Sequence, residues 1–142
     1  MTTLSWPRVL IGGLVAGLVM NVGEAALHGG VVAGDAAQLY AGLNREIIAD
    51  PLNLMTLIGA TFLVGIASIW IYASIRPRYG PGPRTAVLAG LAVWICAHLF
   101  AGAYLGAGFA GIIPPRLAWV PVAWGLVEAP IATIIGAWFY RE

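Results

Sequence analysis

The sequence predicts an all-α, polytopic membrane protein: four transmembrane helices in a bundle, with a short helix on the outer surface. Composition is the first reason, because 61% of the 142 residues are hydrophobic and only 9% are charged, against about 25% charged residues in soluble domains. Patterning is the second, because four long apolar segments stand at about residues 8–29, 53–75, 85–107 and 117–140. A soluble fold of this length could not bury so much apolar surface, so we expect lipid as the solvent.

Each of the four segments is expected to be a transmembrane helix. With about 22–24 residues and a rise of 1.5 Å per residue, each is long enough to cross a hydrocarbon core of about 30 Å. Backbone groups in lipid must pair within their own segment, which favours helices over strands. A cleaved signal peptide is the alternative for the first segment, but its apolar run is long and no clear A-x-A cleavage site follows. We therefore expect a single transmembrane domain over residues 1–142.

The distribution of arginines predicts the orientation of these helices. All seven basic residues are arginines, five expected on one side of the membrane and two on the other: Arg8, Arg76, Arg78, Arg84 and Arg141 against Arg45 and Arg116. Cytoplasmic loops carry the excess of positive charge. Both termini and the loop at 76–84 are therefore expected in the cytoplasm.

The connection over residues 30–52 is the only long one and faces the outside in this orientation. Asp35 is expected to cap a helix that Asp50-Pro51 ends. Within it, apolar residues recur at helical spacing: Leu39, Tyr40, Leu43 and Ile47. This pattern predicts a short amphipathic helix on the outer surface. A plain connector and a lid over the outer mouth of the bundle are both open as its role.

The first transmembrane segment carries polar side chains that hydrocarbon disfavours. At about 100° per residue they share one face of the helix with two glycines. The members of this stripe are Gly13, Gly17, Asn21, Glu24 and His28. Small residues permit close helix contact and polar groups then face the neighbour instead of lipid, so we expect the stripe to point into the bundle.

The third segment adds His98 at the expected depth of Asn21, and the fourth adds Glu128 nearer the midplane, within side-chain reach. We expect one intramembrane polar cluster in the outer half of the bundle, with His28 at its rim: Asn21, Glu24, His28, His98 and Glu128. No lysine occurs in the chain and no arginine lies at this depth to balance the two carboxylates. Three outcomes are open: an acid is protonated, a histidine carries the matching charge, or a cation such as a metal ion or an amine occupies the site.

This cluster is interpreted as a binding site or proton relay, because ionisable groups inside membranes are usually functional. The alternative is a polar network that only fixes helix register. Metal ligation is also open, since imidazole and carboxylate suit iron, zinc or manganese, although the paired Glu-x-x-His motif of di-metal bundles is absent. A haem held between His28 and His98 is a further alternative. The sequence leaves the cofactor unknown.

The stretch "IRPRYGPGPRTA" (75–86) places Arg76, Arg78 and Arg84 at the level of the lipid headgroups. We expect these arginines to anchor the topology and to contact anionic lipids. Capture of a phosphate ligand is the alternative, although no Walker-type spacing supports it. The net charge of +1 leaves no basic face for nucleic acid, so no nucleic-acid partner is expected.

Four stretches of the chain are distinctive: "GGLVAGLVMNVGEAALHGG" (12–30), "IRPRYGPGPRTA" (75–86), "GLAVW" (90–94) and "AWGLVEAPIATIIGAWFYRE" (123–142). Together they resemble a family of small, uncharacterised bacterial four-helix integral membrane proteins. The resemblance covers nearly the whole chain and implies four spans in the bacterial inner membrane. It implies no reaction, ligand or catalytic residue.

Three functions from different classes follow. The first is a non-enzymatic accessory or binding subunit, since the G-x-x-x-G pairs Gly13/Gly17 and Gly102/Gly106 suit packing against other helices. The second is a proton- or cation-coupled small transporter or channel that acts as an oligomer. The third is a membrane protein that binds a metal, haem or pigment. No catalytic residue is predicted, and the expected partners are membrane lipids and either further copies of the chain or a larger membrane complex.

Overall fold

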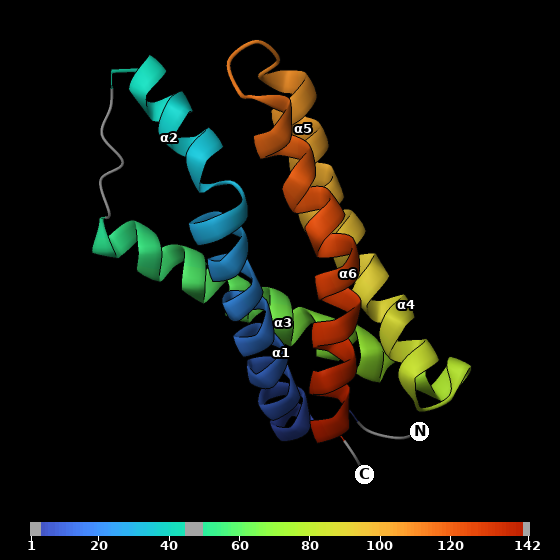
Figure 1. Ribbon diagram of the computed structural model, residues 1–142. Helices are drawn as coiled ribbons and strands as arrows, with labels where there is room; N and C mark the ends of the chain where they lie inside the picture. Colours follow the sequence, from blue (N-terminus) through green and yellow to red (C-terminus); the bar gives the residue numbers. More distant parts are fainter. Residues whose placement is uncertain (1–3, 45–49, 141–142) are drawn as a thin grey trace.

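The computed structural model describes residues 4–44 and 50–140, which are built of helices and contain no β-strand (Figure 1). In chain order the elements are α1 (Trp6–Ala26), the π-helical segment η1 (Leu27–Val31), α2 (Ala33–Gly42), α3 (Pro51–Tyr79), α4 (Pro83–Trp94), the π-helical segment η2 (Ile95–Leu99), α5 (Phe100–Gly108) and α6 (Pro115–Phe139). Four continuous helical stretches are long and apolar enough to cross a membrane: Trp6–Val31, Pro51–Tyr79, Pro83–Gly108 and Pro115–Phe139. The expected all-α class with four such helices is confirmed.

The four long helices pack in a definite set of pairs. α1 contacts α3 and α6, α4 contacts α6 and α3, and α5 continues along α6. Figure 1 shows α1 and α6 close together near both chain ends and further apart toward α2, while α3 runs across them. The beginning of α1 and the end of α6 therefore lie at one end of the molecule, and α2 lies at the other.

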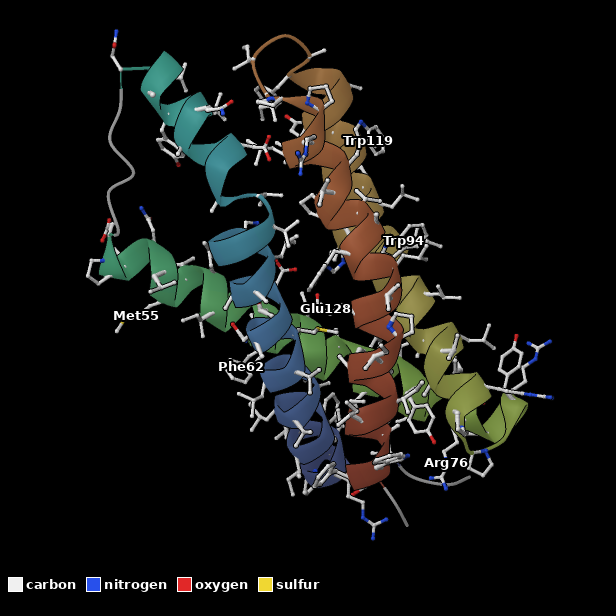
Figure 2. All side chains as sticks on the ribbon, in the orientation of Figure 1. Met55, Phe62, Arg76, Trp94, Trp119 and Glu128 are labelled. Carbon is white, nitrogen blue, oxygen red and sulfur yellow. The ribbon has the colours of Figure 1, made fainter. Side chains whose placement is uncertain are left out.

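The core lies toward the end that holds the chain termini, and small side chains dominate it. Its buried members include Ala16, Met20, Ile69, Ala86, Ala89, Ala129, Ala132 and Ala137. Glycines bring the helices into contact there: Gly13 and Gly17 of α1 lie against Ile66 and Phe62 of α3 (Phe62 in Figure 2). Small residues allow the backbones to approach this closely.

The second G-x-x-x-G pair is also used within the chain. Gly102 lies against Val122 of α6, and Gly106 lies against Trp119 of the same helix. Both glycine pairs that the sequence offered for contact with a partner therefore contact helices of the same chain.

The other helices leave the beginning of α3 largely uncovered. All ten residues over 51–60 are exposed, among them Leu52, Leu54, Met55 and Leu57. Figure 2 shows Met55 on this projecting part of α3. In a bilayer these side chains contact lipid or another apolar surface.

α3 ends later than the sequence suggested, at Tyr79 rather than near residue 75. The helix continues through Pro77, which near a helix end removes only one backbone hydrogen bond. Arg76 and Arg78 therefore lie in the last helical turn, where positive charge is favourable for the helix dipole. Gly80, with φ of 82°, then ends the helix.

A helix is also present where the outer helix was expected, but Asp35 is not its N-cap. α2 begins at Ala33 because a single residue, Val32, separates it from η1. Asp35 instead lies in the first turn, and its Oδ2 is 3.6 Å from Nε of Arg116 at the start of α6. The residues Arg45, Ile47 and Arg141, used above for orientation and for the outer helix, lie outside the described residues.

Candidate functional site

Three ionisable side chains from three different helices meet between α1, η2 and α6. Nε2 of His98 is 3.4 Å from Oε1 of Glu24 and 4.0 Å from Oε2 of Glu128. One potential ligand atom from each of the three residues lies within 4.8 Å of the other two. We call Glu24, His98 and Glu128 the acid–histidine site.

His28 extends this site toward the surface. Its Nδ1 is 3.1 Å from Oε2 of Glu24, one helical turn away. The exposed fraction of the side chains falls in order along the group, from 59% for His28 to 27% for Glu24, 13% for His98 and 7% for Glu128. The site therefore runs from an exposed imidazole to a buried carboxyl group.

The buried end of the site contains polar atoms without partners. Nε1 of Trp124 donates a hydrogen bond of 3.2 Å to Oε1 of Glu128. Within the described part of the chain, neither Oε2 of Glu128 nor Nδ1 of His98 has a hydrogen-bond partner. A buried polar atom without a partner costs about 1–3 kcal/mol. Such atoms in a native protein need a physical explanation, and binding of an ion is one.

Two glycines that the sequence analysis did not single out make room for this site. A Cβ added at Gly23 of α1 would collide with the carboxylate of Glu128, and one added at Gly125 of α6 would collide with the ring of His98. Gly125 precedes Glu128 by three residues and so shares its helix face, a spacing that could have identified it. Gly23 lies next to Glu24, off the polar stripe, and carried no such signal.

Both histidines lie in π-helical segments. His28 belongs to η1, and His98 belongs to η2. A π-turn inserts one residue into the helix and rotates the residues after it by about 100°. Such segments are rare and are frequent at functional sites. Each of the two π-helical segments thus contains one of the two histidines of the chain.

Asn21 makes different contacts from those expected. Its side-chain amide donates 2.8 Å and 3.5 Å hydrogen bonds to the carbonyls of Gly17 and of Ile58 in α3. The stripe on the first helix therefore contacts two different neighbours. Asn21 faces α3, whereas Glu24 faces η2 and α6. Asn21 acts as a link between α1 and α3.

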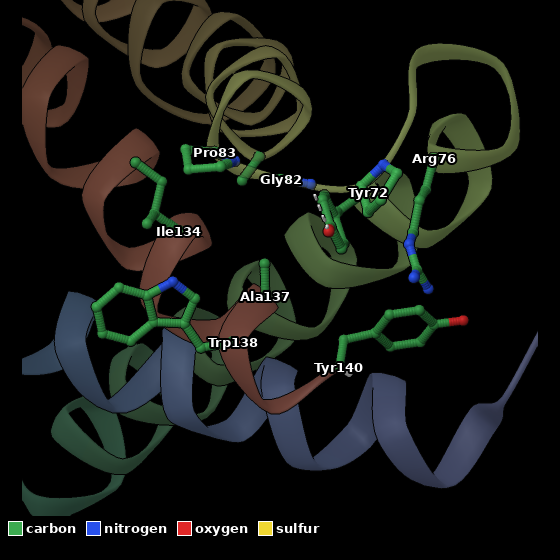
Figure 3. Close-up of a pocket in the computed structure, with 10 residues that line it drawn as sticks. Tyr72, Arg76, Gly82, Pro83, Ile134, Ala137, Trp138 and Tyr140 are labelled. Carbon is green, nitrogen blue, oxygen red and sulfur yellow. Dashed lines mark hydrogen bonds between the residues drawn. The ribbon is translucent and has the colours of Figure 1, made fainter. Parts of the chain in front are cut away.

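The predicted lipid-contact arginines lie at the other end of the molecule. Arg76 lines a cavity of about 250 Å³ beneath the Pro81–Pro83 turn, together with Tyr72, Trp138 and Tyr140 (Figure 3). Its Cζ lies 5.8 Å from the centre of the Tyr140 ring. The backbone N–H of Gly82 donates a 3.3 Å hydrogen bond to the Tyr72 hydroxyl, which holds the turn over this cavity.

The other two arginines of this set point elsewhere. Cζ of Arg78 lies 6.0 Å from the centre of the Tyr79 ring, and Arg84 is exposed. Neither Arg78 nor Arg84 lines the cavity. Exposed arginines beside aromatic rings at one end of the apolar helices suit the headgroup region of a membrane.

No protein-family model, curated protein or solved structure matches this chain. The resemblance to bacterial four-helix membrane proteins therefore stays a prediction.

Proposed function

We propose that this chain is a multi-pass protein of the bacterial inner membrane whose acid–histidine site binds a cation in competition with protons, the chemistry of a small proton- or cation-coupled transporter. Both termini lie in the cytoplasm in this proposal, and the exposed His28 faces the outer side. Assembly with further copies or with another membrane subunit stays a prediction.

The observation that carries this proposal is that two carboxyl groups of apolar helices meet at one histidine, and that neither pairs with an arginine among the described residues. Glu24 and Glu128 approach the same imidazole nitrogen of His98. Arg116, at the start of α6, pairs with Asp35 of α2 and so lies away from this site. A carboxylate in an apolar environment needs a proton or another cation, so the site takes up one or the other.

The prediction of an accessory subunit loses part of its support. One observation in its favour was that two G-x-x-x-G pairs suit packing against other helices. Gly13 and Gly17 contact α3, and Gly102 and Gly106 contact α6. The glycine pairs therefore argue for packing within this chain.

A transition-metal ion is the second candidate occupant, because three potential ligand atoms lie within 4.8 Å of one another. At a tetrahedral zinc ion with bonds of about 2.0–2.2 Å, ligand atoms lie about 3.4 Å apart. However, metal-bound histidines almost always use their second ring nitrogen in a hydrogen bond, and Nδ1 of His98 has no such partner in the part of the chain that the structure describes. A haem between the histidines would need the space of Glu24, which contacts both.

Reversible protonation of Glu128 can be tested with dicyclohexylcarbodiimide, an apolar reagent that adds to protonated carboxyl groups. We expect mass spectrometry of the protein in phosphatidylcholine nanodiscs to find Glu128 modified increasingly as the pH falls from 9 to 5. Glu24, His98 and, through Glu24, His28 are the titratable groups that face it.

Asp35 provides the control for this labelling, since it lies in α2 and pairs with Arg116. Glu128→Gln should remove the main modified peptide, whereas Asp35→Asn should leave it unchanged. Labelling of Glu128 that is absent, or that does not change over this pH range, would contradict a site that exchanges protons.

The orientation gives a separate prediction. A reporter fused after the last residue should remain in the cytoplasm, whereas one inserted at Gly42, the end of α2, should be exported. The reason is the excess of arginine at the end that holds the termini and the α3–α4 turn. Export of the C-terminal fusion would show that the orientation is inverted or that the number of spans is odd.

A further inference from the structure

An apolar groove runs between α1 and α6 beside the acid–histidine site. Its volume is about 650 Å³, within the range of about 300–1,000 Å³ that is usual for small-molecule sites. The side chains that line it include Val19, Val22, Val120, Val127, Ile131 and Trp124. A ligand held there would therefore contact mainly aliphatic groups and one indole.

Among the described residues, Glu128 is the one ionisable side chain in the wall of this groove. Figure 2 shows it where α1 and α6 face each other. Only 7% of its side chain is exposed, and its Oε2 has no hydrogen-bond partner within the described part of the chain. Because Gly23 has no side chain, the carboxyl group reaches the boundary between the groove and the acid–histidine site.

The edges of the groove belong to the faces of two helices that are apolar enough to span a membrane. Val22 of α1 and Val127 of α6 line it and are themselves exposed. In a bilayer such exposed aliphatic groups contact lipid. A ligand therefore reaches this groove from the hydrocarbon and must itself be largely apolar.

We propose that the groove binds an amphiphilic amine, with its ammonium group against Glu128 and its hydrocarbon body along Val19, Val22 and Val127. This inference rests on the proposed function and names the class of cation that the site takes. Charge complementarity selects the head of the ligand, because the wall formed by residues 4–44 and 50–140 offers a carboxyl group and no cationic side chain. The indole of Trp124, which also lines the groove, favours a cation further.

Two other occupants would use only part of this arrangement. The acyl chain of a lipid would fill the apolar groove and leave Glu128 without a partner. A metal ion would use Glu24, His98 and Glu128 and leave the groove unused. An amphiphilic amine is the class of ligand that engages both the carboxyl group and the apolar wall.

Three probes with the same ten-carbon chain separate the contribution of the head group: decylamine, decanol and decanoate. Binding is measured by calorimetry to the full chain in phosphatidylcholine nanodiscs, with the signal of empty nanodiscs subtracted. We expect saturable binding of decylamine, at least tenfold weaker binding of decanol, and no binding of decanoate. Glu128→Gln should reduce the affinity for decylamine at least tenfold without changing that for decanol.

A matched pair of variants tests the groove itself. Val22→Trp places an indole at the edge of the groove and should weaken decylamine binding at least tenfold. Leu18→Trp places the same group one turn earlier on α1, on an exposed residue that does not line the groove, and should change the affinity less than twofold. This pair tests the inference even if Glu128→Gln does not fold.

Four results would overturn the inference. They are equal binding of decylamine and decanol, binding of decanoate as tight as that of decylamine, equal effects of the two tryptophan variants, and binding of zinc chloride alone with no binding of decylamine. If pH-dependent carbodiimide labelling of Glu128 persists in any of these cases, the inference fails while the proposed function stands. If that labelling is absent, the proposed function itself fails.

Discussion

Gly65→Ala should lower the free energy of unfolding by about 1–3 kcal/mol, the usual cost of overpacking a close-packed site. Gly65 of α3 lies against the Gly13/Gly17 face of α1. An added Cβ would collide with the backbone N of Gly17 and lie 2.6 Å from the carbonyl oxygen of Gly13. Both are backbone atoms, so the strain can be relieved only by moving α1 away from α3.

Gly59→Ala is the matched control, because Gly59 lies in the same helix and a Cβ there would have no atom within 4 Å. Alanine is favoured over glycine in a helix by roughly 0.5–1 kcal/mol, so this variant should be as stable as the wild type or more stable. Unfolding in mild detergent, followed by the loss of helical circular dichroism, measures both. Equal stability of the two variants would contradict the close contact between α1 and α3.

Glu128→Ala should cost about 1–3 kcal/mol of stability, because it leaves Nε1 of Trp124 without the acceptor of its partly buried hydrogen bond. It also leaves Nε2 of His98 with Glu24 as its one carboxyl neighbour among the described residues. Glu128→Gln keeps a carbonyl oxygen that can accept the hydrogen bond from Trp124, so it should cost little. Val127→Ala is the control, since it shortens the adjacent, exposed side chain on the same helix. Thermal unfolding of the three variants over pH 5–8 measures these differences.

The pH dependence of the same variants separates function from simple packing. If the acid–histidine site exchanges protons, Glu128→Gln should stay folded and lose the pH-dependent part of the wild-type stability that Glu128 contributes. Glu24, His98 and His28 remain in this variant and will still titrate. A stability profile for Glu128→Gln that coincides with the wild type at every pH would mean that Glu128 is only a structural hydrogen-bond acceptor.

Local sequence was enough to predict the helices. Four apolar runs of about 22–24 residues predict spanning helices, because hydrocarbon leaves the backbone no other way to satisfy its polar groups. The contact between Glu24 and His28 was equally predictable, since residues four apart on a helix are neighbours. The structure has this contact at 3.1 Å.

Two local details were wrong for reasons that are also local. α3 continues to Tyr79 because a proline in the last turn removes only one hydrogen bond. Asp35 is not an N-cap because α2 follows η1 after one residue. Helix signals in the sequence identify a helix more reliably than they identify its first or last residue.

Only the tertiary structure decided which helix each face meets. Helical periodicity placed Asn21 and Glu24 on one stripe, yet Asn21 binds Ile58 of α3 while Glu24 contacts His98. A stripe specifies a direction from one helix axis, but the crossing of α3 over α1 determines where one neighbour ends and the next begins. The π-turns at η1 and η2 also rotate the side chains that follow them around the helix axis, and the hydrophobic pattern of the sequence does not predict these turns.

The tertiary structure also decided which residues form the acid–histidine site. The residue types of Glu24, His98 and Glu128 were visible in the sequence, but their meeting depends on positions 74 and 104 residues away from Glu24 along the chain. That meeting requires the absence of side chains at Gly23 and Gly125. Polar residues in apolar helices thus indicate that a site exists. The close packing of three helices decides which residues form it, which of their atoms lack a partner, and where the groove lies.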